Sequence, residues 1–198
     1  MPFPEAEKET QNIYARSGEG MEETFAEAFI NLGGKFIFCD SEQEMIQNIN
    51  MLHESRGWTQ MLCAYEKVQK LLGKYNMDIA TPLVQHIEDA DACITGCETL
   101  VARTGSVMLS SKQYMGRTAP VYYPVHIIIA YADQIVPDID DAFALMKKKY
   151  GSDLPSMINL NTGPSRTADI EKTLVVGVHG PAEVFCFLVN ADSGLYYR

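Results

Sequence analysis

The sequence predicts an α/β domain built around a largely parallel sheet. Segments of helical periodicity alternate with short apolar or β-branched segments along most of the chain, which is typical of repeated strand–helix units. The run VHIIIAY at 125–131 is almost continuously apolar, as expected for a strand covered on both faces. A chain of 198 residues is long enough for one domain with a substantial core. We therefore expect residues 18–198 to form a single domain, preceded by an N-terminal arm at 1–17.

Two helices in the first half of the chain carry clear end signals. In MEETFAEAFINLGG (21–34), apolar residues recur at helical spacing and the paired glycines stop the helix. In DSEQEMIQNINML (40–52), Ser41 and Glu44 form the pattern of a capping box. The other elements expected in this half are strands at 35–39 and 60–65 and a helix at 66–73 that ends at Gly73.

The second half combines short strands with two expected helices. Residues 91–111 are rich in β-branched residues and are interrupted by Gly96 and Gly105, which predicts two or three short strands joined by tight turns. A helix at 137–151 has aspartates in its first turn and three lysines in its last turn. These charges complement the helix dipole, so the lysine run is interpreted as a helix end and not as a binding patch. The remaining expected elements are strands at 156–162 and 183–190 and a helix at 168–176.

The charge balance argues against several classes of partner. A formal net charge of -10 disfavours DNA, RNA and anionic membranes, because phosphate-rich surfaces reward Lys and Arg. The longest apolar run, at 121–132, is interrupted by Pro124 and His126 and is too short for a membrane span. The first ten residues lack the basic and apolar regions of a signal peptide. We therefore expect a cytoplasmic protein.

The cysteine pattern gives no support for a metal or cluster site. The five cysteines are an odd number, which speaks against a disulfide framework. Cys93 and Cys97 are four residues apart, and this spacing matches neither zinc sites nor iron–sulfur ligands. We expect these cysteines to be small buried apolar residues and predict no bound metal.

The segment NTGPSRTADIEKTLVVGVHGPAEV (161–184) holds most of the unusual chemistry. If a helix follows TGPSRT, Ser165 or Thr167 is its N-cap and the first backbone N–H groups face an anion. Arg166 adds a planar donor suited to carboxylate or phosphate. Together these groups supply only about the 4 kcal/mol of a millimolar dissociation constant, so a free small acid is held weakly.

Two other interpretations of this segment stay open. Asp169 and Glu171 can simply stabilise the helix start, with Arg166 paired to one of them; the sequence favours this and the anion site equally. A catalytic set of Ser165, His179 and Asp169 is less favoured, because GPSRT lacks the second glycine of the G-x-S-x-G motif.

A second pocket wall is expected at 94–106. Gly96 and Gly105 allow close backbone approach, and hydroxyl groups are offered by Thr95, Thr104 and Ser106, although a hairpin with glycine turns has the same appearance. His179 lies between glycines, where a turn presents the ring or bonds it to the backbone. His126 is interpreted first as a buried strand histidine and second as a pocket residue.

These segments resemble one family. TGPSRTADIEKTLVVGVHGP is similar to the signature of LUD-domain proteins such as lactate-utilisation protein C. ITGCETLVARTGSVMLSS and YYPVHIIIA resemble that family's upstream blocks in the same order. The matching positions are Thr104, Gly105, His126, Gly163, Pro164, Ser165, Arg166, Thr167, Asp169, Ile170, Glu171, His179, Gly180 and Pro181. The chain departs from the family at Arg103, where an acidic residue is usual, and at Cys97, where alanine is usual.

The resemblance implies a Rossmann-like α/β fold similar to those of ribose-5-phosphate isomerase, CoA transferases and 5-formyltetrahydrofolate cyclo-ligase. It also implies a role in oxidising L-lactate to pyruvate, beside partner proteins that carry the iron–sulfur clusters. The main hypothesis is a cluster-free subunit of such a system that binds a small anionic metabolite or phosphate-bearing cofactor. The rivals are a non-catalytic docking scaffold and a stand-alone enzyme acting on a phosphorylated or folate-like substrate.

The candidate residues follow from this hypothesis. Ser165 and the amides after it would hold the anion, Arg166 would clamp it, and His179 would donate or accept a proton. The candidate catalytic residues are His179, Asp169 and Glu171. The candidate ligand-binding residues are Thr104, Gly105, Ser106, His126, Gly163, Ser165, Arg166, Thr167 and Gly180.

Overall fold

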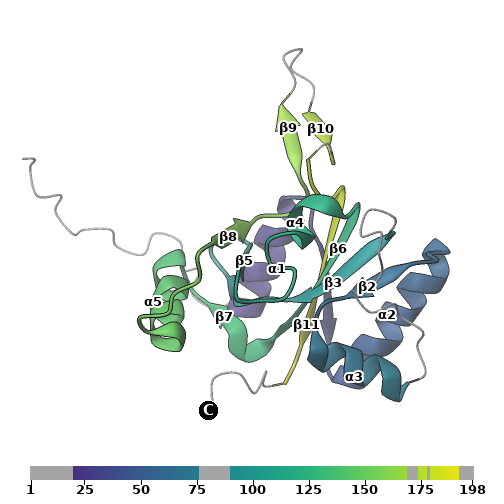
Figure 1. Ribbon diagram of the computed structural model, residues 1–198, viewed down its shortest axis with the longest axis horizontal. Helices are drawn as coiled ribbons and strands as arrows, with labels where there is room; N and C mark the ends of the chain where they lie inside the picture. Colours follow the sequence, from purple (N-terminus) through teal and green to yellow (C-terminus); the bar gives the residue numbers. More distant parts are fainter. Residues whose placement is uncertain (1–19, 76–89, 169–173, 178, 192–198) are drawn as a thin grey trace, which may run out of the picture.

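The computed structural model describes residues 20–75, 90–168, 174–177 and 179–191, so the expected arm at 1–17 lies outside the described residues. A five-stranded parallel sheet, in the order β1-β11-β6-β3-β2, runs through the centre of the molecule (Figure 1). Its strands are β1 (Lys35–Cys39), β2 (Met61–Cys63), β3 (Ala92–Gly96), β6 (Val125–Tyr131) and β11 (Glu183–Val189). This parallel sheet confirms the predicted α/β fold class.

Two helices cover one face of this sheet, α2 (Glu42–Arg56) and α3 (Glu66–Lys74). Met45 and Ile49 of α2 and Val68 of α3 share one apolar cluster with Ile127 and Ile129 of β6. Side chains alternate along a strand, so these β6 residues face α2 and α3 while Ile128 and Ala130 face the other way. The fully buried β6 is thus covered on both faces, as its apolar run predicted.

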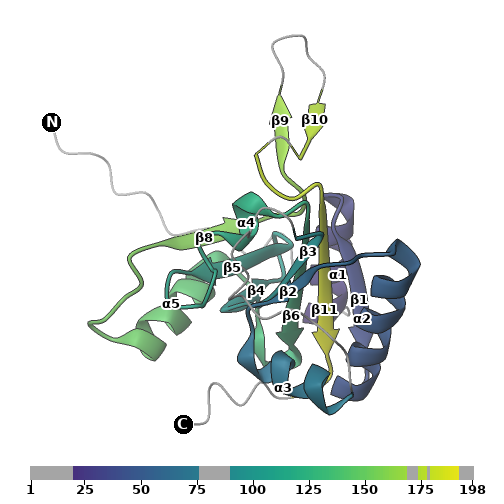
Figure 2. The ribbon, with the colours of Figure 1, turned by 45° about the vertical axis from the view of Figure 1, so that its right-hand side comes forward.

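The opposite face packs against α1 (Met21–Asn31) and a second sheet, ordered β7-β4-β5-β8. The second sheet is mixed: β4 pairs antiparallel with β5 and parallel with β7, and β5 pairs antiparallel with β8. The strands are β4 (Thr99–Val101), β5 (Ser106–Ser110), β7 (Ile135–Val136) and β8 (Ile158–Asn161). Helix α5 (Ile139–Tyr150) covers its outer face (Figure 2). The short α4 (Ala119–Tyr122) precedes β6, and a 3-10 turn, η2 (Ala132–Gln134), follows it.

Most predicted elements appear at the predicted places. Of the two or three short strands expected within 91–111, the structure has three, β3, β4 and β5; β3 belongs to the parallel sheet and the other two to the mixed sheet. At the start of α2 the Ser41 hydroxyl accepts from the Glu44 N–H at 3.2 Å, while the Glu44 carboxylate accepts from the Asp40 N–H at 2.8 Å. Gly73 does not end α3, which continues through Lys74. None of the described helices combines the length and apolarity that a bilayer span requires.

The predicted helix at 168–176 is wrong. The chain forms two short antiparallel strands there, β9 (Arg166–Ala168) and β10 (Leu174–Val176), in which Arg166 pairs with Val176. These strands project from the body of the molecule as a ribbon (Figures 1 and 2). The ends of the segment are β-branched, at Thr167 and at Val175 and Val176, and such residues favour strands over helices. No helix therefore begins at Ser165 or Thr167.

Candidate functional site

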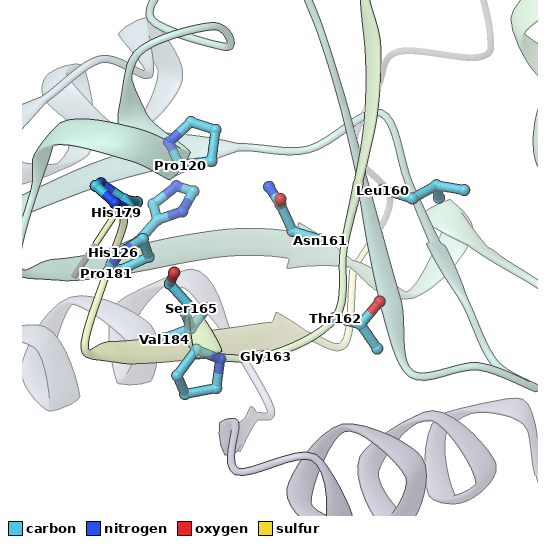
Figure 3. A pocket seen from close by; sticks show the side chains of 11 residues that line it. Pro120, His126, Leu160, Asn161, Thr162, Gly163, Ser165, His179, Pro181 and Val184 are labelled. Carbon is cyan, nitrogen blue, oxygen red and sulfur yellow. The ribbon is translucent and has the colours of Figure 1, made fainter. Parts of the chain in front are cut away.

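A pocket of about 260 Å³ lies where the signature segment meets the parallel sheet (Figure 3). His126 and Val184 stand at the amino ends of β6 and β11. The pocket is therefore at the amino ends of these strands and at the carboxyl end of β8, whose last residue, Asn161, lines it. Its lining residues are Pro120, His126, Leu160, Asn161, Thr162, Gly163, Pro164, Ser165, His179, Pro181 and Val184.

His126 forms part of the pocket wall although only 1% of its surface is exposed to solvent. Its Nε2 lies 2.8 Å from the Oγ1 of the buried Thr95, on the neighbouring strand β3. Burial lowers the pKa of His126 to about 3, because desolvation penalises the charged ring. The ring is therefore neutral at physiological pH. Both interpretations of this histidine hold together: it is a hydrogen-bonded core residue and a pocket residue.

The loop before β9 is fixed on the end of α1. Gly163 has φ +76, and a Cβ added there would lie 2.7 Å from the carbonyl oxygen of Leu32. The Ser165 N–H donates to the Pro181 carbonyl at 2.9 Å, and the Gly177 N–H donates to the Ser165 carbonyl at 3.0 Å. The Ser165 amide is thus engaged within the protein, while the residue's side chain reaches the pocket (Figure 3).

The guanidinium of Arg166 contacts the same helix end. Its Nη2 donates to the carbonyl oxygen of Leu32, directly after α1, and Arg166 is not among the pocket-lining residues. A cation at a helix C-terminus interacts favourably with the helix dipole and with the last carbonyl groups. In this structure Arg166 therefore holds the loop at 163–166, the signature loop, against the C-terminal end of α1. Its expected role as an anion clamp stays a prediction.

The second expected pocket wall, at 94–106, does not line the pocket itself. Thr104 Oγ1 donates to Ser106 Oγ at 2.8 Å, and Ser106 Oγ lies 3.0 Å from Oγ1 of the pocket residue Thr162. Gly105 has φ +58, and a Cβ there would lie 2.5 Å from the Phe29 nitrogen of α1. The glycine thus allows α1 to approach, and the hydroxyl groups reach the pocket only through Thr162.

The segment after β10 closes the other side of the pocket. His179 is exposed and lines the pocket together with Pro181. Gly180, with φ +145, lies close to α4 and to Ser165, since a Cβ there would be 3.0 Å from the Pro120 carbonyl oxygen. His126 of β6 and the two signature residues Ser165 and His179 thus surround one cavity (Figure 3).

Sequence reasoning missed Asn161. This residue ends β8 and lines the pocket, and its side-chain nitrogen is buried with no hydrogen-bond partner. In Figure 3 the amide nitrogen points toward the side of the cavity that holds His126. Its position directly before TGPSR, at the end of a strand, is the signal that could have identified it.

The remaining expected residues are distributed as follows. Thr167 lies in β9, and Asp169 and Glu171 lie outside the described residues. Arg103 forms two hydrogen bonds with Asp138, at 2.8 and 2.6 Å, and these hold the pKa of that carboxyl below its usual range. Arg103, where the family usually has an acidic residue, thus contacts Asp138 at the start of α5 and does not line the pocket.

The cysteines are all buried and reduced. Within the described ranges, no three His, Cys, Asp or Glu side chains gather in a way that could hold a metal ion. Burial raises the pKa of the Cys63 thiol to about 11, and such a thiol is a poor nucleophile and a poor metal ligand.

Comparisons with known sequences give a consistent family match. A family model described as the LUD domain matches residues 21–189. Lactate utilization protein C of Bacillus licheniformis is 40% identical over 109 residues, which are 54% of this chain and 45% of that protein. The protein of the same name from Geobacillus thermodenitrificans is 35% identical over 142 residues, 71% of this chain and 55% of that protein. The chain thus spans about half the length of the curated relatives it matches.

A solved structure has the same fold. The crystal structure of a DUF162 family protein from Deinococcus radiodurans matches with a TM-score of 0.64 and 20% sequence identity. The match covers 86% of this chain and 96% of that chain.

Proposed function

Since this chain belongs to the LUD domain family, we propose that it is a component of a lactate-utilisation system that binds a small anionic metabolite. The family match over residues 21–189 and the names of the relatives, lactate utilization protein C, support this role. The iron–sulfur partner proteins implied by the family resemblance belong to the same proposal, as does the oxidation of lactate by the whole assembly.

The observation that carries the ligand-binding part is the shared pocket. The side chains of His126 in β6 and of Ser165 and His179 in the segment 161–184 line one cavity. Asn161 lines it too, and its amide nitrogen is buried without a hydrogen-bond partner. A concave site with a few convergent polar groups is the usual form of a small-molecule site. Ser165 and His179 would contact the ligand, and His179 would transfer a proton if the chain takes part in the chemistry.

The affinity expected of this pocket is low. Three or four neutral hydrogen bonds at about 1 kcal/mol each give about 4 kcal/mol, which corresponds to a millimolar dissociation constant. Arg166 would add to this only by leaving the Leu32 carbonyl oxygen. Lactate and similar metabolites must therefore be tested at tens of millimolar.

Thermal unfolding against lactate, pyruvate, phosphate, CoA, nucleotides, flavins and folates tests the proposal. At about ten times its dissociation constant a ligand stabilises by about 1.4 kcal/mol, a rise in melting temperature of roughly 3–5 °C. The rise is expected for an acidic metabolite with the wild type and with His53→Ala, a histidine of α2 outside the pocket lining. His179→Ala should lose it. Equal rises in His179→Ala and wild type, or none with any compound beyond that of equimolar sodium chloride, would contradict the proposal.

A second function, docking of a partner protein, is favoured by the β9–β10 ribbon. The ribbon has two strands and projects from the body (Figures 1 and 2), and Val176 within it is 51% exposed. Two-stranded ribbons are marginally stable alone, so a partner would stabilise this one. Docking predicts that Val176→Lys prevents co-purification with the iron–sulfur proteins while ligand-induced stabilisation is retained. Retained co-purification would speak against docking through the ribbon.

A further inference from the structure

We propose that the loop joining β5 to α4, residues 111–118, binds the phosphate group of a small phosphorylated molecule through Lys112 and Arg117 (Figure 1). A cavity of about 530 Å³ lies at this loop and is lined by residues 111–118 alone. Its volume is within the roughly 300–1,000 Å³ of small-molecule sites. No residue lines both this cavity and the pocket at the amino end of β6, so the two sites are separate.

The loop is basic in an acidic chain. Residues 111–118 carry two cations and neither Asp nor Glu, whereas the whole chain has a net charge of -10. The Arg117 Nη2 donates to the Ser156 hydroxyl group at 2.5 Å, and in the described part of the chain Arg117 has no carboxylate partner. Since a guanidinium has five N–H donors in a planar fork, most of those of Arg117 are available to an oxyanion.

Lys112 supplies a second cation that a ligand can recruit. Its Nζ lies 2.6 Å from Asp153 Oδ2, and the Asp153 side chain is 83% exposed. Ion pairs this exposed contribute little, so a more highly charged anion can replace Asp153 at Lys112. Both cations lie against the same neighbouring segment, because the Arg117 partner Ser156 is three residues from Asp153. The Ser156 Oγ is also 3.1 Å from Ser111 Oγ, which adds two hydroxyl groups to this side of the loop.

The charges favour a phosphate monoester over a simple carboxylic acid. A monocarboxylate at Lys112 would only exchange one carboxylate for another. A phosphate monoester carries about two negative charges at neutral pH and three acceptor oxygens, so it can accept from Arg117 and Lys112 together. Tyr114 belongs to the same lining and is 62% exposed, and an exposed aromatic ring can stack on a nucleoside base.

The backbone of the loop is held in one conformation. Met115 has φ +59, the one positive φ of a non-glycine residue in the described ranges. Such a conformation is costly and persists where the surrounding structure enforces it; here Met115 packs on the buried Tyr123. At Gly116 a Cβ would clash with the Ser110 carbonyl oxygen. The two cations are therefore presented by a preorganised loop, which reduces the entropy lost when a ligand binds.

Calorimetric titration with AMP, cyclic AMP and adenosine at low ionic strength tests the proposal. These compounds share one nucleoside and carry about two, one and no negative charges at neutral pH. We expect AMP to bind at least about tenfold more tightly than adenosine, with cyclic AMP between them, because charge-assisted hydrogen bonds are strong. Arg117→Gln should weaken AMP binding at least about tenfold. Arg56→Gln removes the same charge from α2, outside the cavity, and should leave the affinity unchanged.

Asp153→Asn tests the site from outside the loop. The substitution removes the carboxylate that competes for Lys112, so AMP should bind several-fold more tightly. An exposed substitution of this kind has little effect on folding. Unchanged or weaker binding would overturn the role of Lys112. Equal affinities for AMP and adenosine, no binding of AMP at about 10 mM, or equal AMP affinities in Arg117→Gln and wild type would each overturn the proposal.

The result is independent of the pocket at the amino end of β6. His179→Ala leaves residues 111–118 intact and should bind AMP as the wild type does. A thermal shift that phosphate esters cause equally in both proteins therefore belongs to this loop, and the response to lactate and pyruvate remains the test of the pocket.

Discussion

At the residue scale, His126 and Glu98 show two ways in which an ionisable side chain is stable when buried. His126 is buried and neutral beside the pocket, while Glu98 is fully buried and surrounded by donors. Ser110 Oγ and Tyr150 OH lie 2.5 and 2.9 Å from Glu98 Oε1, and Lys149 Nζ lies 2.8 Å from Oε2. The first group is stable because it stays uncharged, and the second because its charge is paired.

His126 predicts a specific dependence of stability on pH. The folded ring has a pKa of about 3, whereas a histidine in an unfolded chain titrates near 6.5. Between these values only the unfolded chain binds the proton, so this contribution to stability is complete above pH about 6.5 and decreases as the pH falls. The wild type should lose up to about 1.4 kcal/mol per pH unit more than His126→Asn. Urea unfolding of both proteins at intervals from pH 7 to pH 4 measures this, and parallel curves would contradict it.

Lys149 predicts a difference within the lysine run of α5. Its side chain is only a quarter exposed and pairs with Glu98, so Lys149→Met leaves a buried carboxylate short of its cation. We expect a loss of about 2 kcal/mol, below the range for fully buried pairs because Ser110 and Tyr150 still donate. Lys148→Met is the matched control and should change stability by less than about 0.5 kcal/mol. Equal melting temperatures for the two variants would show that the Lys149–Glu98 ion pair does not stabilise the fold.

At the element scale, α1 is the support on which both walls of the site rest. The loop at 163–166 contacts its C-terminal end through Leu32, and the β4–β5 turn contacts its last turn at Ala28 and Phe29 through Gly105. The positions of α1, of this turn and of the signature loop are therefore linked.

Gly105 tests this arrangement by substitution. A Cβ at Gly105 meets the α1 backbone at 2.5 Å, whereas one at Gly57, which also has positive φ, meets nothing within 4 Å. Gly57→Ala should cost only the conformational penalty of about 1–2 kcal/mol. Gly105→Ala should cost clearly more and should also weaken ligand binding. Chemical denaturation of the two variants compares them directly, and equal costs would show that α1 can move away freely.

The elements themselves were largely predictable from sequence, but their pairing partners were not. Periodicity and capping residues predicted α1, α2 and α5, and the apolar run predicted β6, because these signals are local. The assignment of β3 to one sheet and β4 and β5 to another depends on long-range pairing, which no local pattern encodes. The helix predicted at 168–176 failed because favourable helix residues in its middle were given more weight than the β-branched residues at its ends.

At the scale of the whole molecule, the site lies between two sheets. The parallel sheet contributes His126 and Val184, the mixed sheet contributes Leu160 and Asn161, and the loops after β8 and β10 complete the pocket. The sequence identified the loops through the family signature, and the family match confirms that resemblance. Asn161 was missed although it stands directly before the signature, and its place in the site depends on β8 lying opposite the amino end of β6.

The most direct test of the account is the response of the histidine rings to ligand. The chain has four histidines, and ¹⁵N-histidine labelling makes their ring signals observable by NMR. On titration with L-lactate or pyruvate, the account predicts that the signals of His126 and His179 shift together with one dissociation constant, while that of His53 on α2 stays unchanged. If neither His126 nor His179 responds at ligand concentrations far above the millimolar range, the pocket is not the binding site and the central claim is contradicted.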